Sequence, residues 1–261
     1  MRSRTTIASL LLASVAGSSL VGSAFAYRPF DSTDAAVADL GELEIELGPV
    51  GFRRSETERT LIAPAYVLNY GFAKNWEVVL EGQAEHPLAA ADDSRSRLVG
   101  NALFLKGVLR EGVLQDKSGP SIATEFGVLL PGVNDERGTG ASWTGIISNR
   151  WSWGTVHFNA GAALTREQNA DVFVGTIVEG PYDWKVRPVA EVRYEHEFDA
   201  KQTASALVGA IWKVRDNLAF DFGVREAWVN RRPETEIRVG LTFAFSAEKD
   251  ALHRSSQSSR H

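Results

Sequence analysis

Three neighbouring residues of this sequence carry side chains that could do chemistry together. Ser148, His157 and Asn159 combine a hydroxyl, an imidazole and an amide within a short stretch of chain. A serine can transfer acyl groups when a histidine base lies ~2.6 to 3.2 Å from its hydroxyl and a third group orients that base. The set therefore raises the hypothesis of a hydrolase.

The hairpin that would carry these residues argues against catalysis. A two-residue turn at residues 153–154 would place Ser148 opposite Asn159. The same turn would place Arg150 opposite His157, so Ser148 and His157 become diagonal neighbours, ~7 Å apart or more at their α carbons. No neighbouring loop suggests an oxyanion hole. We therefore predict a polar wall, and a hydrolase using Ser148 and His157 is the alternative.

A second set of residues places acids and bases at every second position beside apolar residues. Glu44 and Glu46, for example, alternate with Leu43, Ile45 and Leu47. A charge facing lipid at the midplane of a bilayer costs ~2 to 4 kcal/mol, so charges opposite a lipid-facing surface must point inward. They could pair across strands and partly fill the interior, or form a charged constriction that selects solutes. The candidates for this lumen are Glu44, Glu46, Glu77, Glu81, Glu125, Arg150, Arg187, Glu191, Arg193, Glu195, Asp221, Arg225, Glu236 and Arg238.

The sequence gives no support for a metal or a cofactor. Its five histidines show no ligand spacing on a shared face, and residues 195–197 alternate faces so that their side chains do not converge. No phosphate loop or nucleotide fingerprint occurs. Zero cysteine excludes a disulfide framework and a thiol nucleophile. We predict that the protein uses neither a metal nor a cofactor.

Alternation of apolar and polar residues is the dominant pattern, and it predicts an all-β chain. We expect a single antiparallel barrel of twelve strands, with ten or fourteen possible, and each strand long enough for the ~9 to 11 residues that cross a bilayer. Pro64 and Pro188 fall inside predicted strands and imply bulges or different strand limits. The predicted strands span residues 42–52, 59–70, 76–86, 95–110, 120–131, 141–152, 155–166, 171–180, 185–198, 202–214, 217–229 and 233–245.

The tryptophans indicate what surrounds the strands. All seven fall near a predicted strand end and none falls in the middle. A soluble core would bury its indoles centrally, whereas a barrel in lipid collects aromatic side chains in girdles at the two interfaces. We therefore predict a transmembrane barrel with these interface residues: Trp76, Trp143, Trp151, Trp153, Trp184, Trp212 and Trp228.

The N-terminus predicts export. Arg2 and Arg4 precede an uncharged stretch at residues 7–21, and residues 24–26 form an A-x-A cleavage site. We therefore assign residues 1–26 to a signal peptide. The formal net charge of −5 argues against nucleic acid as a partner, because phosphate binding needs a basic patch.

The last predicted strand resembles the C-terminal signal that outer-membrane assembly machinery recognises. Arg238, Gly240, Phe243 and Phe245 have its polar, glycine and paired aromatic spacing. The terminal Phe is usually the last residue of such proteins, whereas residues 246–261 follow here. We expect this polar tail to be disordered and periplasmic.

The segment before the first strand has two possible places. This segment, residues 27–41, is short and mixed in composition. We expect them to form a periplasmic strap, and a plug folded into the lumen is the alternative. Phe30 would anchor the segment in either case.

Stretches at both ends and in the middle of the chain resemble a known family, the outer-membrane β-barrels associated with meta-pathway phenol degradation. They are residues 28–34 leading to 41–46, the hairpin at 69–78, and residues 212–220. The resemblance implies a monomeric barrel that passes small hydrophobic or aromatic compounds. It transfers no catalytic or ligand-binding residues.

Together these features predict a channel at residues 42–245 in the outer membrane of a Gram-negative bacterium. Its expected partners are outer-membrane lipid, the assembly machinery and a small organic solute. A structural barrel with a closed lumen is the alternative, and the hydrolase is a weaker one.

Overall fold

The computed structural model describes residues 28–88 and 95–246, and within them twelve strands. The predicted signal peptide and the tail after Ser246 lie outside the described residues. Besides the strands there is one short 3-10 helix, η1, at Val113–Gln115. The strands are β1 (Glu42–Arg54), β2 (Arg59–Ala73), β3 (Trp76–Pro87), β4 (Arg97–Arg110), β5 (Ser121–Leu129), β6 (Gly140–Trp151), β7 (Gly154–Leu164), β8 (Ala170–Glu179), β9 (Val186–Glu197), β10 (Lys201–Arg215), β11 (Leu218–Val229) and β12 (Arg232–Ser246).

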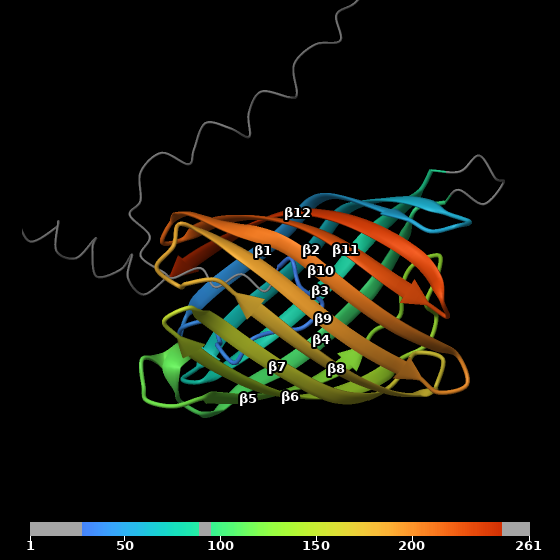
Figure 1. Cartoon of the computed structure of the whole chain (residues 1–261). Helices are drawn as coiled ribbons and strands as arrows, with labels where there is room; N and C mark the ends of the chain where they lie inside the picture. Colours follow the sequence, from blue (N-terminus) through green and yellow to red (C-terminus); the bar gives the residue numbers. More distant parts are fainter. Residues whose placement is uncertain (1–27, 89–94, 247–261) are drawn as a thin grey trace, which may run out of the picture.

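The strands form one closed antiparallel barrel, as predicted (Figure 1). Each strand pairs with its neighbours in sequence, and β1 closes the ring by pairing with β12 from Glu42↔Ser246 to Arg54↔Thr235. Closure removes the free sheet edges, so the strand backbones satisfy one another without water. Within residues 28–88 and 95–246, no helix has the length and apolar character needed to cross a membrane.

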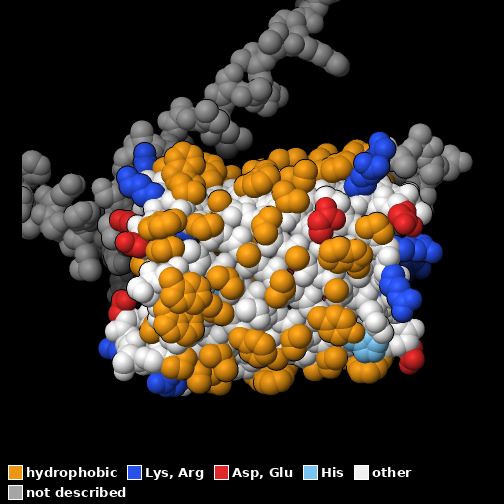
Figure 2. Space-filling view, viewed as in Figure 1, with side chains coloured by type: hydrophobic (Ala, Val, Ile, Leu, Met, Phe, Trp, Pro, Cys, Tyr) orange, Lys and Arg blue, Asp and Glu red, His pale blue; other side chains and the backbone are white. Residues whose placement is uncertain are grey.

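The outer face of the barrel is apolar. Figure 2 shows hydrophobic side chains across its width and most charged side chains at its two ends. Val192 is 61% exposed and Val208 63%, so these side chains point away from the barrel interior. Alternate residues of the same strands, such as Glu191 and Leu207, are buried inside. This is the arrangement of a barrel whose outer surface contacts hydrocarbon.

The tryptophans lie toward the two rims. We define the terminal rim as the one where β1 begins and β12 ends. Five tryptophans lie near the terminal rim and two, Trp143 and Trp228, near the opposite rim. Trp151 and Trp153 stack at the β6–β7 turn with their ring centroids 5.6 Å apart. Six are about half exposed, and Trp76 instead lies over Gly107.

The two prolines inside strands are accommodated differently. Pro64 lies in β2 at a bulge, where the register with β3 shifts between Ile62 and Ala65. Pro188 lies in β9 without a register shift, next to the point where the pairing with β8 ends at Val189. A proline lacks a backbone N–H, so both sit where the hydrogen-bond ladder is interrupted or ends.

The segment before β1 lies inside the barrel. Figure 1 shows it within the ring of strands, and we define residues 28–41 as the plug. We expected a strap outside the lumen, with a plug as the alternative; the described residues occupy the position of the plug. Phe30 packs against Val189, Ile211 and Ala219 of the wall. The strap was the simpler expectation because the segment has no apolar pattern of its own to indicate burial.

Candidate functional site

All the charged residues proposed for the lumen lie on the inner face of the barrel. Arg150 and Arg187 lie near the terminal rim beside Tyr182, with guanidinium carbons 4.0 and 5.7 Å from its ring centre. The buried ones are Glu44, Glu46, Glu77, Glu191, Asp221 and Glu236, and the partly buried ones are Glu81, Glu125, Arg150, Arg187, Arg193, Glu195, Arg225 and Arg238. The structure therefore brings all of them to one enclosed surface.

Three of these acids hold the backbone of the plug. Glu191 accepts hydrogen bonds from the backbone N–H groups of Asp31 and Ser32, both at 2.8 Å. Glu46 accepts one from Arg28 N–H at 2.9 Å, and Glu77 accepts one from Ala38 N–H at 2.7 Å. Backbone N–H groups taken out of water need partners, so these acids make it possible for a strand-free segment to lie in the lumen.

Three arginines surround Asp31 of the plug; we call Arg193, Arg225 and Arg238 the arginine clasp. Arg225 Nε lies 2.6 Å from Asp31 Oδ2, and Arg238 Nη2 lies 2.6 Å from Oδ1. Arg193 Nη1 donates to the backbone oxygen of Asp31 at 2.8 Å. Burial acts to raise the pKa of Asp31, but the guanidinium groups of Arg238, Arg225 and Arg193 outweigh it and hold that pKa below its usual range. The carboxylate is therefore ionised while the plug is docked.

Lys106 is a residue of the plug site that the sequence analysis missed. Its ammonium lies 3.6 Å from Asp34 and 3.6 Å from Glu77, and it donates to Thr33 Oγ1 at 3.2 Å. The side chain is fully buried. The available signal was a single lysine in the otherwise uncharged stretch of β4 from Leu98 to Leu109.

Wall glycines make room for the plug. A Cβ added at Gly48 would meet the guanidinium of Arg28 at 2.5 Å, and one at Gly223 would meet Pro29 at 2.9 Å. Gly175 lies in the same way against Ser32. A Cβ at any of these positions would require the plug side chain beside it to move, so the wall and the plug fit each other in shape as well as in charge.

The space that remains in the lumen lies on the opposite-rim side of the plug. A cavity of about 880 Å³ extends from plug residues 28–33 to the loops of the opposite rim, where it is lined by Glu136, Thr165 and Lys201. On the terminal-rim side, the described residues leave a space of about 10 Å³ beside His157. The plug therefore forms the floor of a solute-sized chamber.

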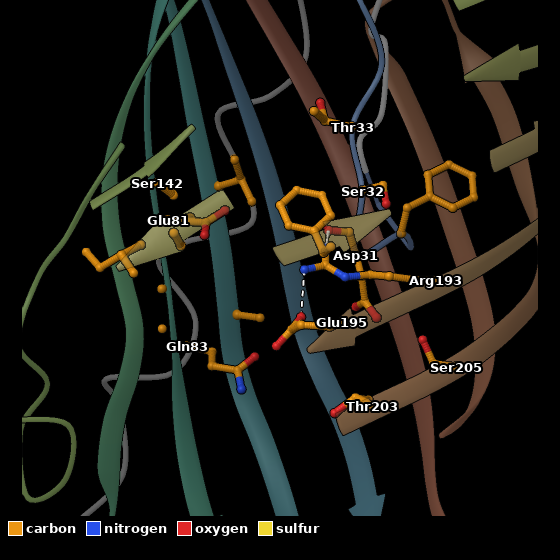
Figure 3. A pocket seen from close by; sticks show the side chains of 18 of the residues that line it. Asp31, Ser32, Thr33, Glu81, Gln83, Ser142, Arg193, Glu195, Thr203 and Ser205 are labelled. Atoms are coloured by element: carbon orange, nitrogen blue, oxygen red, sulfur yellow. Dashed lines mark hydrogen bonds and ion pairs between the residues drawn. The ribbon is translucent and has the colours of Figure 1, made fainter. Parts of the chain in front are cut away.

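The chamber is lined by charged side chains of both signs. The arginine clasp belongs to β9, β11 and β12, whereas Glu81 and Glu125 belong to β3 and β5 on the other side of the ring. Figure 3 shows Glu81 across the pocket from Arg193 and Asp31. A solute at this level meets both acidic and basic side chains.

The β6–β7 hairpin has a different register from the one we expected. The turn is formed by residues 152–153, with Trp151 opposite Gly154, so Ser148 faces His157 directly. Ser148 Oγ lies 2.8 Å from His157 Nδ1, and His157 Nε2 lies 3.5 Å from Glu179 Oε1. The expected diagonal arrangement is wrong, because Gly154 begins the second strand instead of forming the turn. The shift is by two residues, so the side chains keep their faces.

These residues hold the plug. Ser148 Oγ accepts a hydrogen bond from Ala35 N–H at 3.0 Å, and Asn159 bonds both the N–H and the C=O of Thr33. Ser148 and His157 are at most 2% exposed, and the adjoining space of about 10 Å³ is too small for a substrate. A serine and a histidine at hydrogen-bond distance thus form part of the wall in the docked state.

The residues of the predicted assembly signal divide between the two faces. Phe243 and Phe245 lie on the outer face with ring centroids 6.3 Å apart. Arg238 points inward into the clasp, and Gly240 leaves room for the Asp221 carboxylate and Arg28. Arg238 and Gly240 thus contribute to the packing of the lumen, independently of any role in assembly. Recognition by the assembly machinery stays a prediction.

In the part of the chain that the structure describes, no three His, Asp or Glu side chains are grouped so that they could hold a metal ion. The plug site consists of ion pairs and hydrogen bonds among the chain's own groups.

Comparison with protein-family models gave no match for this chain, and comparison with curated proteins gave none. Among solved structures, an outer membrane channel from Pseudomonas putida F1 is similar with a TM-score of 0.59 and 10% sequence identity, covering 83% of this chain and 100% of that chain. The KdgM porin in complex with disordered oligogalacturonate is similar with a TM-score of 0.51 and 12% identity, covering 77% and 98%. At these identities the likeness concerns the fold, which is that of the outer-membrane barrels of Gram-negative bacteria.

Proposed function

We propose that this protein is an outer-membrane channel through which small organic solutes pass passively, and that the plug controls the passage. The observation that carries the proposal is the chamber of about 880 Å³ that ends on plug residues 28–33. Its volume is that of a site for a small molecule. No energy-coupling or redox group is needed for solutes to diffuse through such a lumen.

The way the plug is held supports its role as a gate. Wall side chains make the hydrogen bonds that tie residues 28–38 to the barrel, including those of Glu191, Glu46 and Ser148. Strand pairing begins only at β1. The plug can therefore leave without breaking the ladder that closes the barrel, and water can replace each bond it loses.

The lining of the chamber suits organic solutes that carry both polar and apolar groups. Among its charged residues lie Tyr66, Phe104 and Phe173, whose rings offer flat apolar surfaces. An aromatic solute of the kind implied by the phenol-degradation family could stack on such rings. The likeness to the KdgM porin, solved with an oligogalacturonate, supports the idea that barrels of this fold admit organic solutes.

The expected orientation follows from the same fold. The terminal rim would face the periplasm, because outer-membrane barrels have their short turns there. The opposite rim, where the chamber opens, would face outward, and the barrel would act as a monomer after insertion by the assembly machinery.

The test is single-channel conductance in planar bilayers for the exported chain and for a variant that lacks residues 28–38. We expect low open probability for the full chain and a persistent conductance for the variant. An unboiled gel band that migrates differently from the boiled one would demonstrate that each protein is folded. Two folded, silent proteins would overturn the channel and favour the alternative, a structural barrel with a closed lumen.

A further inference from the structure

The Asp31 carboxylate occupies a site that the barrel wall provides. Its two oxygens are held by different guanidinium groups, those of Arg225 and Arg238, at 2.6 Å each. Arg193 donates to the backbone oxygen of the same residue at 2.8 Å. Charged hydrogen bonds of this length and number are how proteins bind a free carboxylate.

The arginine clasp is oriented by the wall as well as by Asp31. Each arginine has an acidic partner on its own barrel wall, and Arg193 also lies over the ring of Phe173, 4.2 Å from its centre. The three pairs are Arg193 with Glu195 at 2.8 Å, Arg238 with Glu236 at 2.8 Å and Arg225 with Glu234 at 3.5 Å. The clasp would therefore keep its shape when Asp31 leaves, and a preformed site costs less to occupy.

A solute can reach the clasp from the chamber. Asp31 and all three arginines line the cavity of about 880 Å³, and Figure 3 shows Asp31 and Arg193 side by side at its wall. A solute that enters at the opposite rim therefore reaches the clasp without leaving the chamber.

We propose that the arginine clasp binds the carboxylate group of a small organic acid, and that Asp31 is a built-in ligand which holds the plug until such a carboxylate replaces it. The inference rests on the proposed function, because the solute must enter the lumen to compete. The apolar part of the acid would extend into the chamber, which Tyr66 and Phe104 also line. Glu81 and Glu125 on the facing wall would repel a second carboxylate, so the site favours a monocarboxylate whose far end is uncharged.

Competition with Asp31 sets the expected affinities. A carboxylate tethered beside its site acts at an effective concentration of millimolar order or above. A free acid therefore binds the full chain weakly, and removal of the Asp31 carboxylate should raise its apparent affinity about tenfold or more.

The experiment is calorimetric titration of the folded barrel in detergent micelles with benzoate, and with benzamide as the uncharged isostere. We expect Asp31→Ala to bind benzoate about tenfold more tightly than the unaltered chain. Adding Arg238→Gln to that variant should abolish binding, and no variant should bind benzamide measurably. The matched control is Arg97→Gln, an inward-facing arginine outside the chamber, which should leave the benzoate affinity unchanged.

The outcomes separate this inference from the channel itself. Equal binding of benzoate and benzamide, or no gain in affinity on removing the Asp31 carboxylate, would overturn the carboxylate site even if the protein conducts in bilayers. Benzoate binding that depends on Arg238, in a protein that never conducts, would retain the site and reject the channel. If Asp31→Ala gives no heat-modifiable band, Asp31→Asn keeps the side-chain shape and is expected to show the same order of affinities.

Discussion

A disulfide between the plug and the wall should lock the lumen. The chain contains no cysteine, so a double variant Ser32→Cys/Gly175→Cys carries a single possible bridge. Ser32 Cβ lies 3.4 Å from the place where a Cβ on Gly175 would stand, close to the ~3.5 to 4.5 Å that a disulfide requires. The buried Ser32 hydroxyl makes no hydrogen bond to any described residue, so its replacement removes none.

The size of the effect follows from the tether. The bridge fixes residue 32 to β8, while the same segment is already fixed where β1 begins at Glu42. In the chain-entropy account, closing a loop of about ten residues is worth roughly 2 to 3 kcal/mol, which is about a hundredfold in the ratio of docked to undocked plug. The oxidised protein should therefore be closed for as long as the bond persists.

The assay is conductance of the double variant after oxidation and again after a thiol reductant is added. We expect the open probability to fall at least about tenfold on oxidation and to recover on reduction. Ser32→Cys alone should not respond to the reductant, and mass spectrometry should find the loss of two hydrogens in the oxidised double variant. Equal conductance of the oxidised and reduced forms would refute the gate, because solutes would then pass beside a docked plug.

Three further perturbations test the contacts of the plug. The pKa of Asp31 is lowered in the docked state from 3.8, so its stabilisation of docking is complete above about pH 4 and is lost as the pH falls through the docked value. The open-probability difference between the unaltered chain and Asp31→Asn should thus be constant from about pH 7 to 5 and shrink below about pH 4; a difference that grows on acidification would contradict this. Ser148→Ala leaves the Ala35 N–H unpaired, which should weaken docking of the plug by ~1 to 3 kcal/mol and make the plug more sensitive to protease. Ser148→Thr, which keeps the hydroxyl, is the control, and neither protein should have esterase activity. Lys106→Met removes the cation beside Glu77 and should lower the stability of the folded barrel by ~3 to 5 kcal/mol. The folded gel band should then convert to the unfolded one at a lower temperature, and an unchanged temperature would show that the buried pair is not needed.

The barrel was predictable because lipid and water act on alternate residues of every strand. The predicted strand at residues 233–245 is β12 (Arg232–Ser246) in the structure, with Ile237 and Val239 outside and Arg238 inside. A strand that is out of step by one residue would turn its charges to hydrocarbon. The same constraint turns the side chains of the lumen candidates inward.

The register of the β6–β7 hairpin and the place of the plug were not predictable in the same way. A shift of two residues preserves every face, so the alternation that located the strands gives no information on whether Ser148 meets His157 or Asn159. The plug contains no periodic pattern, and its partners lie far along the chain: Asp31 meets Glu191, Arg225 and Arg238. These contacts depend on the closed ring that brings β9, β11 and β12 together.

The acids and the arginines of the lumen hold different groups of the plug. A carboxylate accepts hydrogen bonds and so satisfies the backbone N–H groups of a peptide, as Glu46, Glu77 and Glu191 do for the plug. A guanidinium donates only, and besides their wall partners Glu234 and Glu236, Arg225 and Arg238 bind one further anion. In the docked plug that anion is Asp31, whose carboxylate is an ordinary organic acid group and could be exchanged for another. The acids therefore hold the N–H groups of the plug, while the arginines hold its backbone oxygens at Pro29 and Asp31 and the carboxylate that another acid could replace.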